Sequence, residues 1–346
     1  MNKLFKNFNF QPPTNWTKIR TIDMHTGGEP LRIPIAGLPK MEGNSVLEKR
    51  QFFKDNYDYI RTGLMFEPRG HADMYGALIS EPSSPDADFD VLFIHNEGYS
   101  TMCGHAVLAL TKFAFETNLL PHKTDNKLTL NVPCGTVYAE AKIEDGIVVE
   151  STFENVPSYL HLKDQTVEVE GIGKVKFDVA FGGAYYAFVE AESVGLKMTP
   201  AYYNRLIDYG RKIKYAVMDN FDIQHPTEPD LSFVYGTIFT GKPENSTHHS
   251  RNVCIFAEGE VDRSATGSGV SARAGLHFSK GELLLHQPIT IESILGSTMT
   301  VEAIKKTDFH GYEAVIPKVT GTANFVGQNE FWFDPTDPYR KGFIFR

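Results

Sequence analysis

The sequence predicts an α/β protein made of two halves that repeat one order of strands and helices. Two loops carry this prediction: residues 102–105 (Met-Cys-Gly-His) and residues 265–269 (Ala-Thr-Gly-Ser-Gly). Each loop follows a short apolar run and opens a segment with a helical pattern, and Cys103 and Thr266 each stand nine residues after their run. A chain of 346 residues is long enough to bury a core in each half. The two loops could therefore face one substrate, one with a thiol and the other with a hydroxyl.

In the first half, residues 26–33 read as a strand that contains a Gly-Gly pair. Ser45 and Glu48 form the capping-box pattern of a helix start, and the apolar positions that follow predict a helix to about Arg61. Further strands are expected at three places before the cysteine loop: residues 64–66, residues 74–79 and the apolar run 91–94.

The second half repeats this order. Residues 181–189 again read as a strand with a Gly-Gly pair, and Thr199 and Pro200 are a favourable N-cap and first-turn pair for a helix to about Met218. Strands are then expected at residues 233–239 and at the apolar run 253–257, before the threonine loop. The shared order indicates a duplicated unit.

The expected boundary between the halves lies near Pro157, where strand-forming sequence gives way to polar sequence. The N-terminal half is residues 1–157 with about 325–346, and it carries Cys103. The C-terminal half is residues 158–324, and it carries Asp262 and Thr266. A Phe-rich C-terminal segment, 321–345, reads as strand and could return to pack on the first half. No low-complexity linker separates the halves, so we expect a rigid cleft between them, and such clefts are favoured small-molecule sites.

Composition excludes several classes of protein. The net charge is −9 with no basic run, which argues against nucleic acid as a partner. No segment has the roughly 20 apolar residues that a membrane span needs, and the N-terminus lacks the pattern of a signal peptide, so a cytoplasmic location is expected. Three cysteines without a Cys-x-x-Cys pair indicate reduced thiols, with neither a disulfide framework nor a structural zinc site.

Cys103 is the first candidate catalytic residue. The sequence after it is apolar on nearly all sides, as expected of a helix buried inside its domain. Free N–H groups and the helix dipole at the start of such a helix bind anions and lower the pKa of a thiol, which would make Cys103 a base or a nucleophile. The alternative, an inert packed thiol, is equally compatible with the sequence of this loop alone.

The glycines around Thr266 supply a similar arrangement. Gly267, Ser268 and Gly269 leave their backbone N–H groups unobstructed, so two facing helix N-termini could hold one carboxylate between them. The alternative is a Gly-rich turn without a ligand. A nucleotide-binding fingerprint is not supported, because the third glycine and the phosphate-binding lysine are missing.

The chain resembles the proline racemase family. The resemblance runs in the family's order through about 80% of the chain, in these motifs: Asp23-Met24-His25-Thr26-Gly27-Gly28-Glu29-Pro30, Glu67-Pro68-Arg69-Gly70-His71, Asp73-Met74, Met102-Cys103-Gly104-His105, Phe181-Gly182-Gly183 and 262–269. It implies a diaminopimelate-epimerase-like fold, in which two pseudo-symmetric halves each wrap a twisted sheet around a central helix. It also implies an active site between the halves, no cofactor, no metal and a homodimer.

The racemases and epimerases of this family use two cysteines, one in each loop, on opposite faces of the substrate Cα. Here Thr266 takes the second place, and a hydroxyl is too weak an acid to exchange protons as a thiol does. Threonine at this place resembles the family's dehydratase branch, because a single base is enough for elimination. The resemblance thus implies dehydration of a cyclic hydroxy amino acid, trans-3-hydroxy-L-proline, to pyrroline-2-carboxylate.

In the mechanism that this resemblance implies, Cys103 removes the Cα proton. Backbone N–H groups of four residues would bind the carboxylate: Gly104, His105, Gly267 and Ser268. Asp262 and His105 match the family positions that contact the ring nitrogen. The acid that protonates the departing hydroxyl is not identified, and Thr266 and His105 are both open as candidates.

Other conspicuous residues have simpler interpretations. Cys254 lies in an apolar run and is expected in the core, and Cys134 is expected at a strand or turn position. The pair at 248–249 (His-His) has no third ligand at metal spacing, which favours a solvated loop. Five residues of the family motifs could shape the pocket or hold its loops by hydrogen bonds: Asp23, His25, Glu67, Arg69 and His71.

Three alternative functions stay open. The first is a proline or hydroxyproline epimerase in which Thr266 replaces the second thiol. The second is a non-catalytic binder of cyclic amino acids. The third, a thiol hydrolase with a Cys103–His105 dyad, is disfavoured because residues two apart at a helix start tend to point in different directions.

Overall fold

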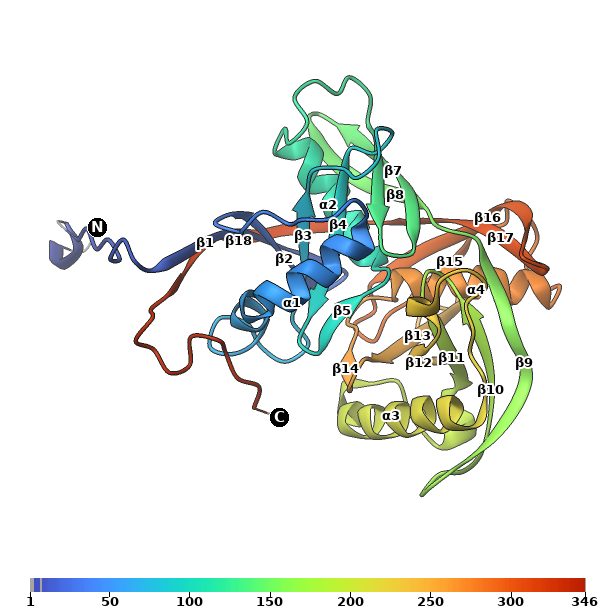
Figure 1. The fold of residues 1–346 in the computed structure, drawn as a ribbon. Helices are drawn as coiled ribbons and strands as arrows, with labels where there is room; N and C mark the ends of the chain where they lie inside the picture. Colours follow the sequence, from blue (N-terminus) through green and yellow to red (C-terminus); the bar gives the residue numbers. More distant parts are fainter. Residues whose placement is uncertain (1–2, 7, 346) are drawn as a thin grey trace.

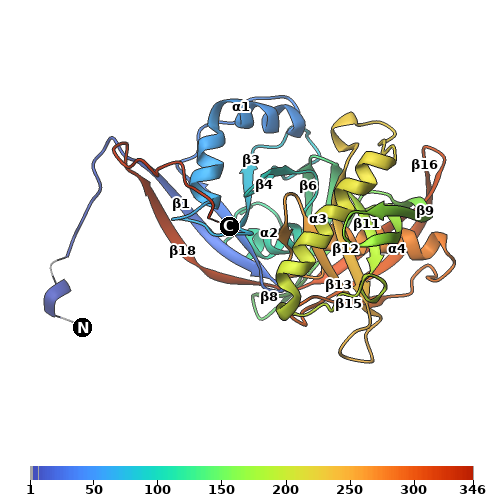
Figure 2. The same cartoon turned by 90° about the horizontal axis from the view of Figure 1, so that it is seen from below.

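The computed structural model describes residues 3–6 and 8–345. These residues form four α-helices, four short 3₁₀ helices and eighteen strands that belong to one continuous, strongly curved sheet system. Figures 1 and 2 show two bodies of strands, one around helix α2 (Gly104–Glu116) and the other around helix α4 (Gly267–Ser279). The α/β class predicted from the sequence is confirmed.

The first body begins with a hairpin and ends with three antiparallel strands. Its elements, in chain order with α2 between β5 and β6, are β1 (Thr17–Thr26), β2 (Glu29–Ala36), α1 (Val46–Met65), β3 (Tyr75–Ser80), β4 (Phe89–His95), β5 (Gly98–Ser100), β6 (Lys127–Val132), β7 (Gly135–Glu144) and β8 (Ile147–Glu154). The C-terminal strand β18 (Ala323–Phe333) pairs antiparallel with β1 along its whole length. The 3₁₀ helix η1 (Lys3–Phe5) precedes them.

The second body begins with a long hairpin, β9–β10. Its elements, with α4 between β14 and β15, are β9 (Ser158–Val169), β10 (Gly173–Phe181), β11 (Tyr185–Glu190), η2 (Ala191–Val194), η3 (Pro200–Tyr202), α3 (Tyr203–Asn220), η4 (Pro229–Leu231), β12 (Val234–Gly241), β13 (Ser250–Phe256), β14 (Glu260–Val261), β15 (Ile289–Glu292), β16 (Thr298–Phe309) and β17 (Tyr312–Gly321).

Strand pairing repeats from one body to the other, as the two similar loops predicted. In the first, β2 and β3 are parallel, β3 and β4 are antiparallel, and β4 pairs antiparallel with β5 and parallel with β6. In the second, β11 and β12 are parallel, β12 and β13 are antiparallel, and β13 pairs antiparallel with β14 and parallel with β15. Helices α2 and α4 therefore occupy equivalent places, each directly after its short strand.

The strands expected at residues 26–33 and 181–189 are confirmed in part, and the error at both places is the Gly-Gly pair. Gly27 and Gly28 have φ values of 60° and 95° and form the turn between β1 and β2. Gly182 and Gly183 lie in the turn between β10 and β11, and Gly183 has a φ of 96°. Glycine adopts positive φ without the steric cost that a side chain brings, so each pair reverses the chain where an extended strand was expected.

Helix α1 begins as predicted and ends later than predicted. The Ser45 side chain accepts a hydrogen bond from the Glu48 N–H, and Glu48 Oε2 accepts one from the Asn44 N–H. The helix bends at Tyr57 and continues to Met65, so the strand expected at residues 64–66 is the last helical turn. In the second body, Pro200 starts η3, which leads into α3, and the Thr199 side chain makes no capping hydrogen bond.

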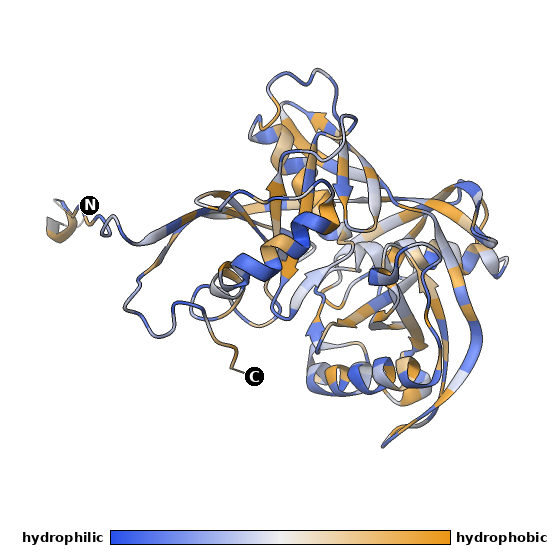
Figure 3. Ribbon diagram, in the orientation of Figure 1, coloured by the Kyte–Doolittle hydropathy of each residue, from blue (hydrophilic) through white to orange (hydrophobic). Residues whose placement is uncertain are grey.

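The largest hydrophobic cluster surrounds α2 and reaches α4, and a second cluster lies between α3 and strands β9 to β13. Nearly every residue of α2 and α4 is buried, whereas α1 and α3 bury one face. Figure 3 shows the alternating hydrophilic and hydrophobic colour along α3 that goes with burial of one face. The surrounding cores thus enclose the two central helices and fix the positions of their N-termini. Among the described residues, no helix is both long and apolar enough to cross a membrane.

Candidate active site

The N-termini of α2 and α4 meet at two glycines. A Cβ atom placed on Gly104 would lie 2.5 Å from the Gly267 Cα, and one placed on Gly267 would lie 2.4 Å from the Gly104 Cα. The first helical hydrogen bonds run from the Val107 N–H to the Cys103 carbonyl and from the Val270 N–H to the Thr266 carbonyl. The three N–H groups before each of these have no acceptor within their helix, so two sets of backbone donors converge.

A small cavity lies where the two helices meet, and its walls come from both bodies. It is lined by Tyr75, Met102, Cys103, Gly104, His105, Tyr186, Tyr235, Cys254, Phe256, Asp262, Thr266, Gly267 and Ser268. All seven site residues that the sequence suggested are on this wall. The free space is about 20 Å³, room for about one water molecule.

Cys103 is the N-cap residue of α2, and its thiol lies against the His105 ring. The Cys103 Sγ is 3.2 Å from the His105 Nδ1, so the expectation that these two side chains point apart is wrong. Residues at N-cap and N2 precede the regular helical spacing, which allows both side chains to turn toward the cavity. The His105 ring also bonds the Pro30 carbonyl, which can only accept. That ring nitrogen is the donor, and the other nitrogen faces the thiol with a lone pair.

The pKa of Cys103 differs in direction from the sequence expectation. Burial raises the pKa of the thiol well above its ordinary value, and the carboxylates of Asp262 and Glu29 add to this. Hydrogen bonds from the Ala106 N–H and the Tyr75 hydroxyl lower it, as a helix start was expected to do. Desolvation outweighs these two donors, because they replace only part of the hydration that a thiolate has in water.

Thr266 stands at the equivalent N-cap of α4, with a backbone that is rare for its side chain. Its φ is 68°, in the left-handed region that a β-branched residue seldom adopts. Its hydroxyl is buried, with no oxygen or nitrogen partner among the described residues, beside the thiol of Cys254. Cys254 is fully buried, as predicted for a core residue, yet it also lines the cavity. A strained backbone and an unsatisfied hydroxyl at one residue are typical of a functional position.

Acidic side chains stand behind the donor groups. Asp262 is buried and accepts a hydrogen bond from the Ser264 N–H at 2.7 Å. Glu29 was not among the site residues expected from the sequence. It is fully buried, and its Oε2 accepts a hydrogen bond from the Arg263 N–H at 2.7 Å. Burial raises the pKa of Glu29 well above its ordinary value, and the charge of Asp262 raises it further. A cation bound in the cavity would find a carboxylate at Asp262.

Three tyrosines complete the wall, and none of them belongs to a motif recognised in the sequence. Tyr75 packs edge-on against the His105 ring, with centroids 4.9 Å apart. The Tyr186 hydroxyl bonds the Ser268 Oγ at 2.7 Å. The Tyr235 hydroxyl is buried near that of Tyr75. Each lies in a strand that is buried along most of its length, and such a run does not show which of its residues reach a cavity.

The other motif residues hold loops and do not line the cavity. Asp23 forms an ion pair with Arg32 at 2.8 Å, and the His25 Nδ1 accepts from the Gly28 N–H. Arg69 lies over the Phe333 ring. The Glu67 carbonyl accepts from the Phe343 N–H, and the His71 ring lies beside the Ala72 carbonyl.

The remaining cysteines and histidines lie elsewhere. All three cysteines are free, as expected, and burial raises the pKa of Cys134 to about 12. His248 pairs with Glu292 at 2.9 Å. Among the described residues, no group of three or more His, Cys, Asp or Glu side chains is arranged to hold a metal ion.

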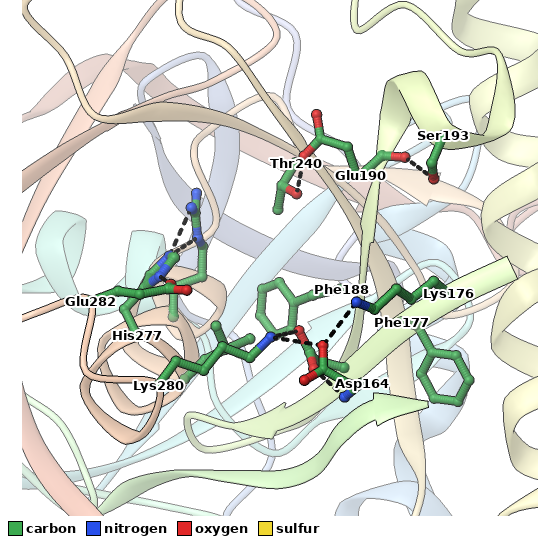
Figure 4. A pocket seen from close by; sticks show the side chains of 13 residues that line it. Asp164, Lys176, Phe177, Phe188, Glu190, Ser193, Thr240, His277, Lys280 and Glu282 are labelled. Atoms are coloured by element: carbon green, nitrogen blue, oxygen red, sulfur yellow. Dashed lines mark hydrogen bonds and ion pairs between the residues drawn. The ribbon is translucent and has the colours of Figure 1, made fainter. Parts of the chain in front are cut away.

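A second cavity, of about 280 Å³, lies at the far end of α4 (Figure 4). Lys280 pairs there with Asp178 at 2.6 Å, and Arg273 bonds His277, which in turn contacts Glu282. Its charges are already matched to one another, and no thiol lines it.

Comparison with known proteins identifies relatives of this chain. A family model described as proline racemase matches residues 21–344. The chain is 51% identical over 333 residues to trans-3-hydroxy-L-proline dehydratase of Colwellia psychrerythraea, covering 96% of this chain and 94% of the relative. It is 44% identical to the human trans-3-hydroxy-L-proline dehydratase over 335 residues, with 95% of each chain covered.

Solved structures show the same fold. A hydroxyproline epimerase from Agrobacterium vitis with bound trans-4-hydroxy-L-proline superposes with a TM-score of 0.90 at 27% identity, covering 96% of each chain. A probable proline racemase from Agrobacterium radiobacter K84 with bound carbonate gives 0.88 at 28% identity, covering 94% of this chain and 96% of the other. The fold that the family resemblance implied is confirmed, and this chain belongs to the proline racemase family.

Proposed function

We propose that this protein removes water from trans-3-hydroxy-L-proline to give pyrroline-2-carboxylate. Its relatives of that name are 43–51% identical over nearly their whole length. The observation that carries the proposal is the asymmetry of the two facing helix starts. A thiol stands at one N-cap and a hydroxyl at the equivalent N-cap, so only one of the two facing helix starts carries a base. The Cys254 thiol lies behind the Thr266 hydroxyl on strand β13, away from the helix start itself.

Cys103 as thiolate is the base in this proposal. The substrate's ammonium would lie at Asp262, with the His105 ring beside it. This ion pair neutralises a carboxylate that helps to raise the pKa of Cys103, so substrate binding favours the thiolate. The ammonium also stays charged next to Asp262, which makes the adjacent Cα proton more acidic.

The substrate carboxylate would accept hydrogen bonds from the N–H groups of Gly104, His105, Gly267 and Ser268. These donors precede the first helical hydrogen bond of each helix and belong to rigid, enclosed elements. When the Cα proton leaves, charge develops on the carboxylate oxygens, and fixed donors stabilise that charge more than they stabilise the ground state. Loss of the hydroxyl on Cβ then leaves an enamine, which tautomerises to the pyrroline.

Substrate entry requires the cavity to enlarge, because space for one water does not admit a five-membered ring with a carboxylate. We propose that the units that separate are residues 1–157 with about 325–346, and residues 158–324. The free cysteines are compatible with a reducing compartment such as the cytoplasm. A homodimer stays a prediction, and size-exclusion chromatography with light scattering would measure it.

The test is incubation with trans-3-hydroxy-L-proline in deuterated water, followed by NMR. Appearance of the pyrroline supports elimination, and Cys103→Ser should reduce its rate by about 10²-fold or more, because the hydroxyl is a far weaker base at neutral pH. Cys134→Ser is the matched control, since Cys134 lies outside the cavity. Substrate that is deuterated and inverted at Cα, without pyrroline, would assign an epimerase instead. Binding without any exchange or product would assign a non-catalytic binder.

A further inference from the structure

The stereochemistry of the proposed substrate places the departing hydroxyl on the face of Cys103. In trans-3-hydroxy-L-proline the hydroxyl and the carboxylate lie on opposite faces of the ring. The Cα proton also lies opposite the carboxylate, so the proton and the hydroxyl share one face. A base that removes this proton therefore stands on the side from which the hydroxyl leaves. This inference rests on the proposed function.

Thr266 is excluded as the acid by this argument, because it stands at the helix start opposite Cys103. His105 lies on the same side as Cys103 but has no proton to donate. Its N–H is engaged by the Pro30 carbonyl, and its other nitrogen faces the Cys103 sulfur as an acceptor. Burial also lowers the pKa of His105, which favours the neutral ring. Both candidates that the sequence left open are thus unsuitable.

The acid must lie on the same side of the substrate as Cys103 and must carry a proton, and Tyr75 meets both requirements. It projects from β3 onto the start of α2, its ring packs 4.9 Å from the His105 ring, and it lines the cavity. Its hydroxyl is a hydrogen-bond partner of the Cys103 thiol. Only 3% of the residue is exposed, and burial raises the pKa of Tyr75, so the phenol keeps its proton until a strong base forms beside it.

We propose that Tyr75 is the catalytic acid that protonates the departing hydroxyl. The Cys103 thiolate takes the Cα proton and becomes a thiol, and the Cα–H electron pair is first delocalised onto the carboxylate. That pair then forms the Cα–Cβ double bond as the Cβ–O bond breaks. The oxygen takes that bond's electron pair and the Tyr75 proton and leaves as water. The thiol then returns its proton to the Tyr75 phenolate through their hydrogen bond. The proton from Cα thus replaces the one lost in water, and the site is reset.

The first test is Tyr75→Phe in deuterated water, with NMR of both product and recovered substrate. Pyrroline formation should fall by about 10²–10⁴-fold, the usual contribution of a positioned acid. Exchange of deuterium into Cα of the remaining substrate, with configuration retained, should persist because Cys103 still acts. The ratio of exchange to elimination should therefore rise. An unchanged ratio would overturn the proposal.

Two matched variants remove a phenol hydroxyl elsewhere. Tyr99→Phe removes a hydroxyl that bonds Asp58 outside the cavity, and its ratio should equal that of the wild type. Tyr235→Phe removes the hydroxyl that lies nearest to Tyr75 in the cavity wall. If Tyr235→Phe raises the ratio and Tyr75→Phe does not, Tyr235 is the acid and the assignment of Tyr75 fails.

A second substrate separates acid catalysis from a structural role of Tyr75. Fluoride leaves as a much weaker base than hydroxide and needs no proton. With trans-3-fluoro-L-proline, Tyr75→Phe should approach the wild-type rate, whereas equal impairment on both substrates would overturn the proposal. If the wild type forms no pyrroline from the hydroxy compound, the proposed function itself fails. If it does and Tyr75→Phe behaves like it, only the role of Tyr75 fails.

Discussion

At the scale of single residues, the site depends on side chains whose ordinary properties are changed by burial. Cys103, Thr266 and Glu29 are each less than a twentieth exposed, and none has the partners it would have in water. For Cys103 burial raises the pKa of the thiol, and in the proposed mechanism the substrate ammonium offsets part of this effect. For Thr266 burial leaves a hydroxyl without an oxygen or nitrogen partner among the described residues.

Thr266→Cys should give the protein some ability to epimerise at Cα. A thiol at this place would face Cys103 across the substrate, and the backbone at a φ of 68° tolerates an unbranched side chain better than threonine. The measurement is chiral chromatography of proline or hydroxyproline recovered from deuterated water. Thr266→Ser is the control, because it keeps a hydroxyl and should give no inversion. If the cysteine variant gives none either, pocket shape also separates the two chemistries.

At the scale of elements, the sequence indicated most of what positions the site. The equal spacing of Cys103 and Thr266 from their apolar runs predicted two equivalent helix starts, and the pairing of β4 and β13 confirms the equivalence. The turns at the Gly-Gly pairs were mistaken for strands, because alternation on both sides continues through them. The length of α1 was underestimated. Residues 64–65 are apolar, and a short apolar run fits a buried helix end as well as a strand.

Gly104→Ala should separate the two helix starts. The new methyl group would lie within 2.5 Å of the Gly267 backbone, and backbone cannot rotate away as a flexible side chain does. We expect a loss of about 1–3 kcal/mol in the free energy of unfolding and a larger loss of activity. Urea denaturation and the NMR assay measure the two effects. Gly327→Ala is the control, since a Cβ there meets no atom within 4 Å. Equal stability of both variants would contradict the close approach.

At the scale of the whole molecule, the site exists only where the two bodies meet. The sequence could place Cys103 and Thr266 on separate loops, but no local pattern says which strands supply Tyr75 or Glu29 to the space between them. That information comes from packing: Glu29 reaches the Arg263 N–H across 234 positions of sequence. The resemblance to a family identified the chemistry, whereas the tyrosines required the fold.

Glu29→Gln should change how stability depends on pH. The pKa of Glu29 is raised in the folded protein, so its contribution is fully present below about 4.5 and is lost as pH rises through the folded value. Between pH 5 and pH 8 the wild type should therefore lose stability relative to Glu29→Gln, by at most about 1.4 kcal/mol per pH unit. Urea denaturation across this range measures the difference. Parallel curves would show that Glu29 ionises as freely as in the unfolded chain.

The contact between Gly104 and Gly267 has one further consequence. Each helix start bears about half a positive charge, so the fold holds two like poles of helix dipoles close together. The carboxylate of Asp262 at the cavity wall offsets part of this repulsion. An anion between the two helix starts would be attracted by both at once. The same close approach that shapes the cavity therefore also makes it selective for negatively charged groups.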